Sequence, residues 1–600
     1  MLKKHEFDLL NLFLTDKTSA RLSQRGLAAR LSRSVGAVNG DLAALLARGE
    51  IQSGQNGYEV TAAGAAAMEP YRVDNAVIMA AGMSKRFAPL SYEKPKGLLR
   101  VKGDILIERE IEQLQAAGIG DITLVVGYMK EKFFYLEEKY GVSIRVNEDY
   151  YKYNNTSTLM CVPDLLKNTY ICSSDNYFPE NVFERYVWHA YYSAVYADGE
   201  TNEYCLSCAP SGRIRRVTVG GRDSWYMLGH VYFDRAFSGK FREILEREYP
   251  LPETKEMLWE DLYARHVKEL DMEIRRYPDG SIFEFDSLDE LRLFDPAYLN
   301  NADSRIMENI CRVLCCEEKD IEEIKAIKAG LTNTSFSFRV GENKYVYRHP
   351  GAGTENYIDR KSEAFSMKVA ARLGLDDTFL YMDEKEGWKI SRFIEDVREL
   401  DYHNREQVAT ALSMMKKLHA ENVRSDFDFL IWNKTEEFIE RLKETGKLEI
   451  RDFDELYALM KTVKDAVTSD EYAALCLCHC DCYSPNFILD KTGKIYLIDW
   501  EYSGNDDPAS DVGTFVCCSD YTFEEALNVI RVYLGREAEK KELGHYLGYI
   551  ALASYYWYVW ALYQEYRGNA VGDYLYLWYK NSKFYAKKSL ECYEEEKNEK

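Results

Sequence analysis

The sequence predicts a multidomain protein of three consecutive folds: a small helical domain with a β-hairpin, an α/β domain with a mixed sheet, and an α+β domain of two lobes. Three observations predict this. The chain has 600 residues, more than one hydrophobic core usually organises. Its apolar periodicity changes character near residue 70 and again near residue 300. Clusters of polar residues follow strand-like segments on both sides of the second change.

The composition excludes some classes of protein. With 46% hydrophobic and 14% aromatic residues, the chain is globular throughout, and its net charge of -22 argues against broad binding to nucleic acid or anionic membranes. The longest apolar run, residues 551–562, is shorter than the roughly 20 residues of a membrane span, so we expect no membrane insertion. The first residues lack the apolar core and cleavage site of a signal peptide. We therefore expect a cytoplasmic protein with its fourteen cysteines reduced.

Residues 1–70 read as short helices followed by a hairpin. The helices are expected at residues 5–14, 23–31 and 34–51. Two glycine-containing turns follow, and the whole resembles a winged helix-turn-helix domain. The third helix offers Asn39 but few cations, and Asp41 would face the phosphates of a nucleic acid. We expect a regulatory or packing role, with DNA binding by this domain possible but not favoured.

Residues 74–298 begin with an apolar strand at 75–80 that runs into a loop rich in Lys and Arg. A helix at 105–119 and a second apolar strand at 121–128 follow. Strand, basic loop, helix and strand form a βαβ unit, which places a phosphate site at the end of the first strand. Further apolar strands and intervening helices continue the α/β pattern.

The loop after the first strand carries the pattern AAG-x3-R-x2-P-x5-PK. The small residues that let the backbone approach a base and phosphates are Ala80, Ala81 and Gly82. Arg86 and Lys96 would neutralise a triphosphate. The segment resembles the nucleoside-triphosphate transferases that activate sugar phosphates and phosphocholine, which implies a Rossmann-like nucleotidyltransferase domain. Ser84 departs from the pattern, because the family usually has a second glycine there.

The resemblance implies two acidic ligands for Mg²⁺. Asp175 stands at the end of a strand, where the first ligand belongs, and Asp286 matches the second. Carboxylates that bind Mg²⁺ at the α-phosphate would offset the charge that develops there. Asp286 could instead cap the helix that follows it, with Asp289 or Asp295 as the metal ligand.

The substrate of this domain is suggested by further similarities. Residues 147–159, 225–233 and 257–263 resemble bacterial phosphocholine cytidylyltransferases. The residues that the resemblance implies for substrate binding are Asn155, Trp225, Trp259, Glu260 and Asp261. Aromatic rings would bind a quaternary ammonium by cation–π contacts, although core packing remains the alternative for most of these aromatics.

Residues 301–600 hold a second constellation. The segment 479–486 reads HCDCYSPN, and an apolar hairpin leads from it to Asp499. This is the arrangement that phosphoryl transfer needs: Asp481 would orient the attacking hydroxyl, while Asn486 and Asp499 would hold Mg²⁺.

The segment IDWEY at 498–502 resembles the choline/ethanolamine kinases and their aminoglycoside-phosphotransferase relatives. The resemblance implies a bilobal, protein-kinase-like fold in which residues 330–338 form a hairpin over the nucleotide. It also implies that Arg348 occupies the strand position of the phosphate-binding lysine of protein kinases, with Glu363 as its ion-pair partner.

Trp557 and Trp560 lie three residues apart and hence on one helical face. They resemble the paired tryptophans of the choline pocket in choline kinases, and core packing is the open alternative. Glu501 and Asp511 would add negative charge near the ammonium or support the metal. Asp520 is the candidate for an acid that family members carry shortly after the Asp511 region.

Together the resemblances imply a two-step synthesis. ATP would phosphorylate choline, and CTP would then react with phosphocholine to give CDP-choline, with Mg²⁺ as cofactor in both steps and surface glycans of bacteria as the destination. The first alternative is the same chemistry on ethanolamine or another amino alcohol. The second is a DNA-binding regulator whose enzyme-like domains sense ligands. The sequence leaves the oligomeric state open.

Overall fold

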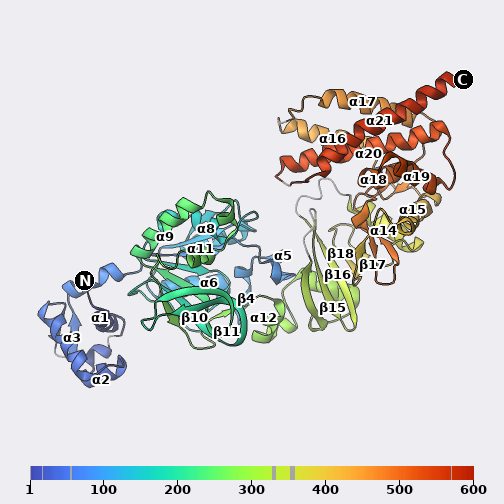
Figure 1. Ribbon diagram of the computed structural model, residues 1–600. Coiled ribbons are helices and arrows are strands. Elements are labelled where there is room, and N and C mark those ends of the chain that lie inside the picture. The colour runs from blue at the N-terminus through green and yellow to red at the C-terminus, as the bar shows by residue number, and fades with distance from the viewer. Residues whose placement is uncertain are drawn as a thin grey trace. The chain divides into compact units, whose positions relative to one another are not determined.

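The computed structural model describes residues 2–16, 18–54, 57–327, 333–351, 359–446, 448–568 and 570–599. The chain forms two compact units (Figure 1). Unit 1 holds residues 1–311 with 317–319, and unit 2 holds residues 312–316 with 320–600. The finer predicted boundaries, at 70/74 and 298/301, remain predictions.

The N-terminal module of unit 1 consists of helices and one hairpin. Its elements are α1 (Lys4–Thr15), α2 (Gln24–Arg30), α3 (Val35–Ala47), β1 (Ile51–Gly54), β2 (Gly57–Val60) and α4 (Ala62–Met68). Ser23 and Ser34 cap α2 and α3, since their hydroxyls accept hydrogen bonds from backbone N–H groups in the first turn of each helix. Leu9, Leu27 and Leu45 are fully buried between the helices.

The core of this module continues into the following domain. The ring of Tyr71 stacks on Trp188 with centroids 5.0 Å apart, and Phe7 of α1 lies 5.1 Å from Tyr71. The backbone N–H of Val187 donates to Tyr71 O at 2.9 Å. The module is therefore packed against the α/β domain of the same unit.

The α/β domain is built on a mixed, seven-stranded sheet with the order β12-β10-β11-β8-β3-β6-β7. The strands are β3 (Asn75–Ala80), β6 (Ile122–Val126), β7 (Ser143–Val146), β8 (Thr169–Ser173), β10 (Tyr191–Cys208), β11 (Ile214–Phe233) and β12 (Glu273–Arg276). β3 is parallel to both β6 and β8, whereas β11 is antiparallel to β8. The predicted βαβ unit is therefore present as β3, α6 (Leu106–Ala116) and β6.

Both faces of the sheet are covered by helices, which explains the nearly continuous apolar strands. Ile78 and the α6 side chains Ile107 and Ile111 belong to one core, while Val77 belongs to another. The remaining helices of this domain are α5 (Leu90–Glu93), α7 (Tyr135–Tyr140), α8 (Asn155–Met160), α9 (Arg235–Glu248), α10 (Pro252–Glu256), α11 (Trp259–Arg265) and α12 (Leu288–Phe294). The short strands are β4 (Arg100–Val101), β5 (Asp104–Ile105), β9 (Asn176–Tyr177) and β13 (Phe283–Glu284).

A helix, α13 (Arg305–Leu314), spans the boundary between the two units. The small lobe of unit 2 is an antiparallel five-stranded sheet with the order β14-β15-β16-β18-β17 and one helix, α14 (Arg360–Leu373). Its strands are β14 (Ile321–Ile327), β15 (Asn333–Val340), β16 (Asn343–Pro350), β17 (Phe379–Met382) and β18 (Lys389–Arg392). Residues 328–332, which include the start of the expected nucleotide-covering hairpin, lie outside the described residues.

The large lobe of unit 2 is mainly helical. Its helices are α15 (Arg405–Ala420), α16 (Ile431–Glu444), α17 (Phe453–Thr468), α18 (Pro508–Cys517), α19 (Phe523–Leu534), α20 (Lys540–Tyr566) and α21 (Tyr574–Glu599). Its strands are β19 (Arg398–Glu399), β20 (Cys476–Cys478), β21 (Phe487–Leu489), β22 (Ile495–Leu497) and β23 (Gly504–Asp506). β21 and β22 are the predicted hairpin, with Phe487 paired to Leu497. Across the described part of the chain, every helix is too short or too polar to span a membrane.

Candidate active sites

The first site lies at the end of β3, where the chain turns into the basic loop. Ser84 has φ +46°, in the left-handed region, which explains why a glycine suits this position. The backbone N–H of Tyr128 donates to Ala81 O at 3.1 Å, and this bond fixes the loop against the end of β6. The loop thus presents its backbone at the edge where parallel strands end, the usual ligand site of such sheets.

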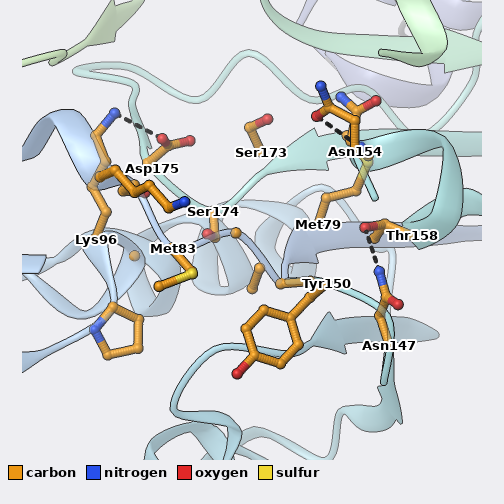
Figure 2. Close-up of a pocket in the computed structure, with 18 of the residues that line it drawn as sticks. Met79, Met83, Lys96, Asn147, Tyr150, Asn154, Thr158, Ser173, Ser174 and Asp175 are labelled. Carbon is orange, nitrogen blue, oxygen red and sulfur yellow. Dashed lines mark hydrogen bonds and ion pairs between the residues drawn. The ribbon is translucent and has the colours of Figure 1, made fainter. Parts of the chain in front are cut away.

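This loop lines a cavity of about 710 Å³. The predicted site residues that line it are Ala80, Ala81, Gly82, Arg86, Lys96, Asn155, Asp175 and Asp286. Figure 2 shows Lys96 and Asp175 on one side of the cavity and Asn147, Asn154 and Tyr150 on the other. The structure therefore brings the phosphate and metal candidates of this domain together.

Lys96 is buried, and its Nζ lies 2.7 Å from Asp175 Oδ2 (Figure 2). Burial disfavours its charge, but Asp175 and Glu284 outweigh that effect and raise the pKa of Lys96. Gly97 is required here, because a Cβ at this position would lie 2.8 Å from Ser174 Oγ. The close approach of the two segments holds Lys96 beside Asp175.

Glu284 is a carboxylate that the sequence reasoning missed. It lies on β13, lines the cavity, and approaches Lys96 Nζ at 4.0 Å. Burial and the nearby Asp175 raise the pKa of Glu284 above its usual range. Asp286 lies two residues further on, and its Oδ2 is 3.0 Å from Arg86 Nη1. The sequence could have indicated Glu284, because it stands two residues before Asp286 and strand alternation places residues i and i+2 on one face.

Three of the carboxylates that line this cavity have the chemistry to bind a divalent cation. Asp175, Glu284 and Asp286 offer the oxygen ligands that Mg²⁺ prefers, beside the lysine and arginine that would bind a triphosphate. When bound, such an ion polarises a phosphoryl oxygen. The competing candidates have other roles: Asp289 lies near Arg292, and Asp295 accepts a hydrogen bond from the Lys102 N–H.

Four residues predicted to bind substrate lie outside the lining of the cavity. Trp259 is fully buried and stacks on Tyr192 with centroids 5.6 Å apart, so it packs in the core. Trp225 packs edge-on against Tyr196. Asp261 accepts a hydrogen bond from Tyr204 Oη at 2.8 Å.

Glu260 is the fourth of these residues, and it supports the cavity wall from behind. Its carboxylate accepts hydrogen bonds from Tyr192 Oη at 3.1 Å and from Asn155 Nδ2 at 3.3 Å. Burial raises the pKa of Glu260 to about 7. Asn155 lines the cavity, so Glu260 influences the cavity through its hydrogen bond with Asn155.

The second site lies in the large lobe of unit 2, on the loop between β20 and β21. Asn486 Nδ2 donates to Asp481 Oδ2 at 2.9 Å and to Asp481 O at 2.8 Å. Burial and the charge of Asp499 raise the pKa of Asp481 well above its usual range. Asp499 follows β22, and the N–H of Ile498 beside it donates to Asn486 O at 2.9 Å. The hairpin therefore sets the predicted triad of Asp481, Asn486 and Asp499 side by side.

Backbone strain marks this site. Cys480 and Asp499 have φ of +66° and +64°, in the left-handed region that residues with a side chain rarely adopt. Such strain persists only where surrounding contacts hold it, and it is common at functional sites. Here His479 provides one contact, since its Nε2 lies 2.9 Å from Ile498 O and joins the two strained segments.

Asp511 supports the loop that carries Asp481. It is fully buried at the start of α18, and its carboxylate accepts hydrogen bonds from the N–H groups of His479 and Cys480 at 2.9 and 2.7 Å. His419 Nε2 lies 3.0 Å from the same carboxylate. Asp511 therefore holds the loop of Asp481 in place, and its predicted role beside an ammonium or a metal stays a prediction.

Arg348 and Glu363, the remaining predicted residues of the small lobe, form an ion pair. Arg348 on β16 binds Glu363 on α14 through two contacts, of 2.6 and 2.7 Å. Its guanidinium also lies 3.7 Å from Asp499 and 3.7 Å from Glu501. Asn333 Nδ2 donates to Glu501 at 2.8 Å, which ties Glu501 to the small lobe.

Trp557 and Trp560 on α20 are nearly buried, with centroids 5.4 Å apart. Two aromatics that the sequence reasoning missed adjoin Trp557: Trp578 at 5.9 Å and Tyr502 at 6.0 Å. Tyr502 follows Glu501, so this aromatic cluster is continuous with the loop of Asp499. Asp520, by contrast, is exposed and pairs with His403.

Comparisons with known proteins cover both units. Residues 76–218 match the family model of the MobA-like NTP transferase domain, and residues 324–549 match that of choline/ethanolamine kinase. The choline-phosphate cytidylyltransferase of Streptococcus pneumoniae is 33% identical over 38% of this chain and 98% of its own length. The 2-aminoethylphosphonate cytidylyltransferase of Lancefieldella rimae is 35% identical over 38% of this chain and 93% of its own length.

Protein LicA of Haemophilus influenzae is 23% identical over 41% of this chain and 94% of its own length. Among solved structures, the cytidylyltransferase of Streptococcus pneumoniae has a TM-score of 0.37 at 33% identity and covers 38% of this chain and 99% of its own. The choline kinase LicA of the same species has a TM-score of 0.40 at 22% identity and covers 48% of this chain and 98% of its own.

Proposed function

Because this chain belongs to the MobA-like nucleotidyltransferases, as a homologue of choline-phosphate cytidylyltransferase fused to a choline/ethanolamine kinase domain, we propose that it makes CDP-choline in two steps. In the first step the hydroxyl of choline attacks the γ-phosphorus of ATP, and ADP leaves. In the second step a phosphate oxygen of phosphocholine attacks the α-phosphorus of CTP, and pyrophosphate leaves. The observation that carries the proposal is that one chain holds two complete sets of acidic and basic residues, one in each unit.

In the kinase step, Asp481 would accept a hydrogen bond from the substrate hydroxyl and orient it. Asn486 and Asp499 would hold Mg²⁺, which offsets charge on the phosphates. Asn486 also holds the Asp481 carboxylate by its hydrogen bond of 2.9 Å, so the base is aimed before the substrate binds. Arg348 would bind the nucleotide phosphates.

In the transferase step, Lys96 and Arg86 would neutralise the triphosphate. Asp175, together with Glu284 or Asp286, would hold Mg²⁺. The pairing of Lys96 with Asp175 at 2.7 Å supports this arrangement, because it places a cation beside the metal site where the α-phosphate would lie.

A second candidate keeps the chemistry and changes the amine. Trp225 and Trp259 lie outside the cavity, whereas Glu256 lines it and has no part in the metal site proposed above. Carboxylates bind a primary ammonium at least as well as a quaternary one, because a primary ammonium also donates hydrogen bonds. This favours ethanolamine as the alternative substrate of both steps, or, for the transferase step alone, the 2-aminoethylphosphonate named for one relative.

The purified full chain, incubated with Mg²⁺, ATP, CTP and one amine at a time, tests the proposal by mass spectrometry. Choline should give CDP-choline, and only when both nucleotides are present. Ethanolamine converted in preference to choline would support the second candidate. 2-Aminoethylphosphonate converted with CTP alone would show that the kinase serves another substrate.

We further propose that the N-terminal module is a winged helix with a regulatory or packing role. Its helices α1 to α3 with the hairpin that follows them, and its aromatic contact with the transferase domain through Tyr71 and Trp188, support this reading.

A further inference from the structure

Glu363 is a fully buried carboxylate of the kinase site. Its side chain has no exposed surface, and Arg348 holds it by a two-point contact from β16. Arg348 has a second set of neighbours, Asp499 and Glu501, each at 3.7 Å. One guanidinium is thus shared among several carboxylates.

Two further cations, neither indicated by the sequence pattern, contact Glu363. Lys389 Nζ lies 3.3 Å from its Oε1, and Arg360 Nη1 lies 3.1 Å from its Oε2. Lys389 stands on β18 directly opposite Arg348 in the strand register. Both side chains are mostly buried, with 13% and 9% of their surface exposed.

The backbone makes room for this arrangement. Gly387, in the turn before β18, has φ +80°, and a Cβ there would lie 2.8 Å from Arg360 Nε. Gly387 O also accepts a hydrogen bond from Arg348 Nη2 at 3.3 Å. The turn therefore holds Arg348 by one hydrogen bond and leaves room for Arg360 beside Glu363.

The cations around Glu363 affect the ability of Arg348 to bind a further anion. Burial alone would raise the pKa of Glu363, but Arg348 and then Lys389 and Arg360 lower it to about 2, so the group stays ionised. If Arg348 were the sole partner, sharing its charge with a bound anion would leave a buried carboxylate that is only partly compensated, which is unfavourable. Lys389 and Arg360 keep Glu363 compensated while Arg348 shares its charge with that anion.

We propose that Lys389 and Arg360 are positioning residues that free Arg348 to bind the phosphates of a nucleoside triphosphate. They do so by neutralising Glu363 without touching the nucleotide, and Arg360 Nη1 also lies 3.9 Å from Glu501. This rests on the proposed kinase function only in naming the ligand, since binding of the nucleotide is measured apart from any acceptor.

The test is a double-mutant cycle on the full chain, with the dissociation constant of Mg·ATP measured by calorimetry. Lys389→Met should weaken binding at least about tenfold, the size of a lost charge-assisted contact. Lys389→Arg, which keeps the charge, should restore most of it. In a Glu363→Gln background, which has no charge to neutralise, Lys389→Met should have no further effect.

Lys368→Met is the matched control, because Lys368 pairs with Glu384 at 2.7 Å on the exposed face of the same lobe. It should leave the dissociation constant unchanged, and cytidylyl transfer by unit 1 should survive in every variant. Unchanged binding in Lys389→Met overturns the proposal, and so does an equal loss in both backgrounds, which would mean direct contact with the nucleotide. Should Lys389→Met fail to fold, Arg360→Gln carries the same cycle with the same two overturning outcomes. Wild-type chain that binds Mg·ATP but phosphorylates no amino alcohol would refute the proposed function and leave this inference standing.

Discussion

Trp557 connects an aromatic cluster on α20 and α21 with the loop of Asp499. Its ring is surrounded by Trp560, Trp578 and Tyr502, and Tyr502 lies three residues after Asp499. An ammonium among these rings would gain cation–π contacts and lie near the carboxylates of the same loop.

Replacing Trp557 with Ala should therefore raise the KM for the amino alcohol far more than the KM for ATP. Loss of a desolvated cation–π contact corresponds to about 2 kcal/mol, or about thirtyfold. Because the side chain is nearly buried, Trp557→Phe is the control for folding, and it should retain much of the affinity. Equal increases in both KM values would contradict a cage at this position, as would a wild-type enzyme that uses ethanolamine and choline equally well.

His545 is a second residue with a measurable signature. It is buried on α20, with Nδ1 3.1 Å from Asp470 and Nε2 3.2 Å from Asp507. Burial opposes its protonation, but the two carboxylates outweigh burial and raise the pKa of His545 above 6.5.

A raised pKa in the folded state means that the stabilisation is complete below the unfolded value of about 6.5 and is lost as pH rises through the folded value. We expect the free energy of unfolding of unit 2 to fall over this window, and His545→Gln to remove that part of the pH dependence. Denaturant titrations at several pH values measure it. A variant with an unaltered pH profile would show that the two carboxylates do not hold the proton.

At the scale of elements, the contact between the loop of Lys96 and the end of β8 leaves no room for a side chain at Gly97. Gly97→Ala would place a methyl group 2.8 Å from Ser174 Oγ and 2.9 Å from Ser174 O, so the segments must separate. Lys96 would then move away from Asp175. Misplacement of a catalytic group by about 1 Å can reduce the rate about a hundredfold.

We expect Gly97→Ala to lose cytidylyl transfer by roughly that factor while phosphorylation by unit 2 continues. Gly120→Ala, in the same domain, is the control, because a Cβ there meets nothing within 4 Å. Steady-state rates with CTP and phosphocholine decide the matter. Full activity in Gly97→Ala would mean that the close approach is not needed.

The structure of α3 shows that the expected orientation of Asp41 was wrong. Asp41 does not face outward, since it is buried, with Oδ1 3.0 Å from His5 Nε2 and Oδ2 paired with Arg33. The expected repulsion between this acid and phosphates therefore carries no weight. What remains is that α3 exposes Val35, Gly36 and Asn39, which offer no positive charge.

We still expect no sequence-specific binding to DNA by the full chain, because binding to phosphates depends on cations. Electrophoretic shifts with the DNA upstream of its own gene, over a range of salt concentrations, measure this. A nanomolar shift that weakens as salt rises would make the module a DNA-binding domain.

At the scale of the whole molecule, the two candidate active sites draw their residues from different units. Asp481→Asn should stop phosphorylation of the amino alcohol, because the hydroxyl loses its orienting acceptor, while cytidylyl transfer to added phosphocholine continues. Asp175→Asn should do the reverse and let the phosphorylated amine accumulate. Loss of either group removes several kcal/mol of transition-state stabilisation at its own site, on the order of 3 kcal/mol or more.

Both reactions are followed in one sample by mass spectrometry, with the wild-type chain and each variant side by side. If one substitution abolished both activities in a folded protein, the assignment of one reaction to each unit would be wrong.

The sequence by itself determined the features that depend on neighbouring residues. The hairpin between Asn486 and Asp499 and the βαβ unit around the loop of Lys96 both follow from short-range periodicity and spacing. Local spacing indicates these features because a turn or a strand end positions the residues that are close to that turn or strand in the chain.

Only the tertiary structure decided which distant residues meet. Glu284 lies near Lys96 although almost two hundred residues separate them in the sequence. Asp511 accepts a hydrogen bond from the loop of Asp481. Lys389, on the strand paired with that of Arg348, contacts Glu363. Trp259, a predicted ligand contact, became part of the core instead. The physical reason is that an aromatic or carboxylate side chain suits a core, a cap and a binding site equally well in its local sequence, and only its packing partners distinguish them.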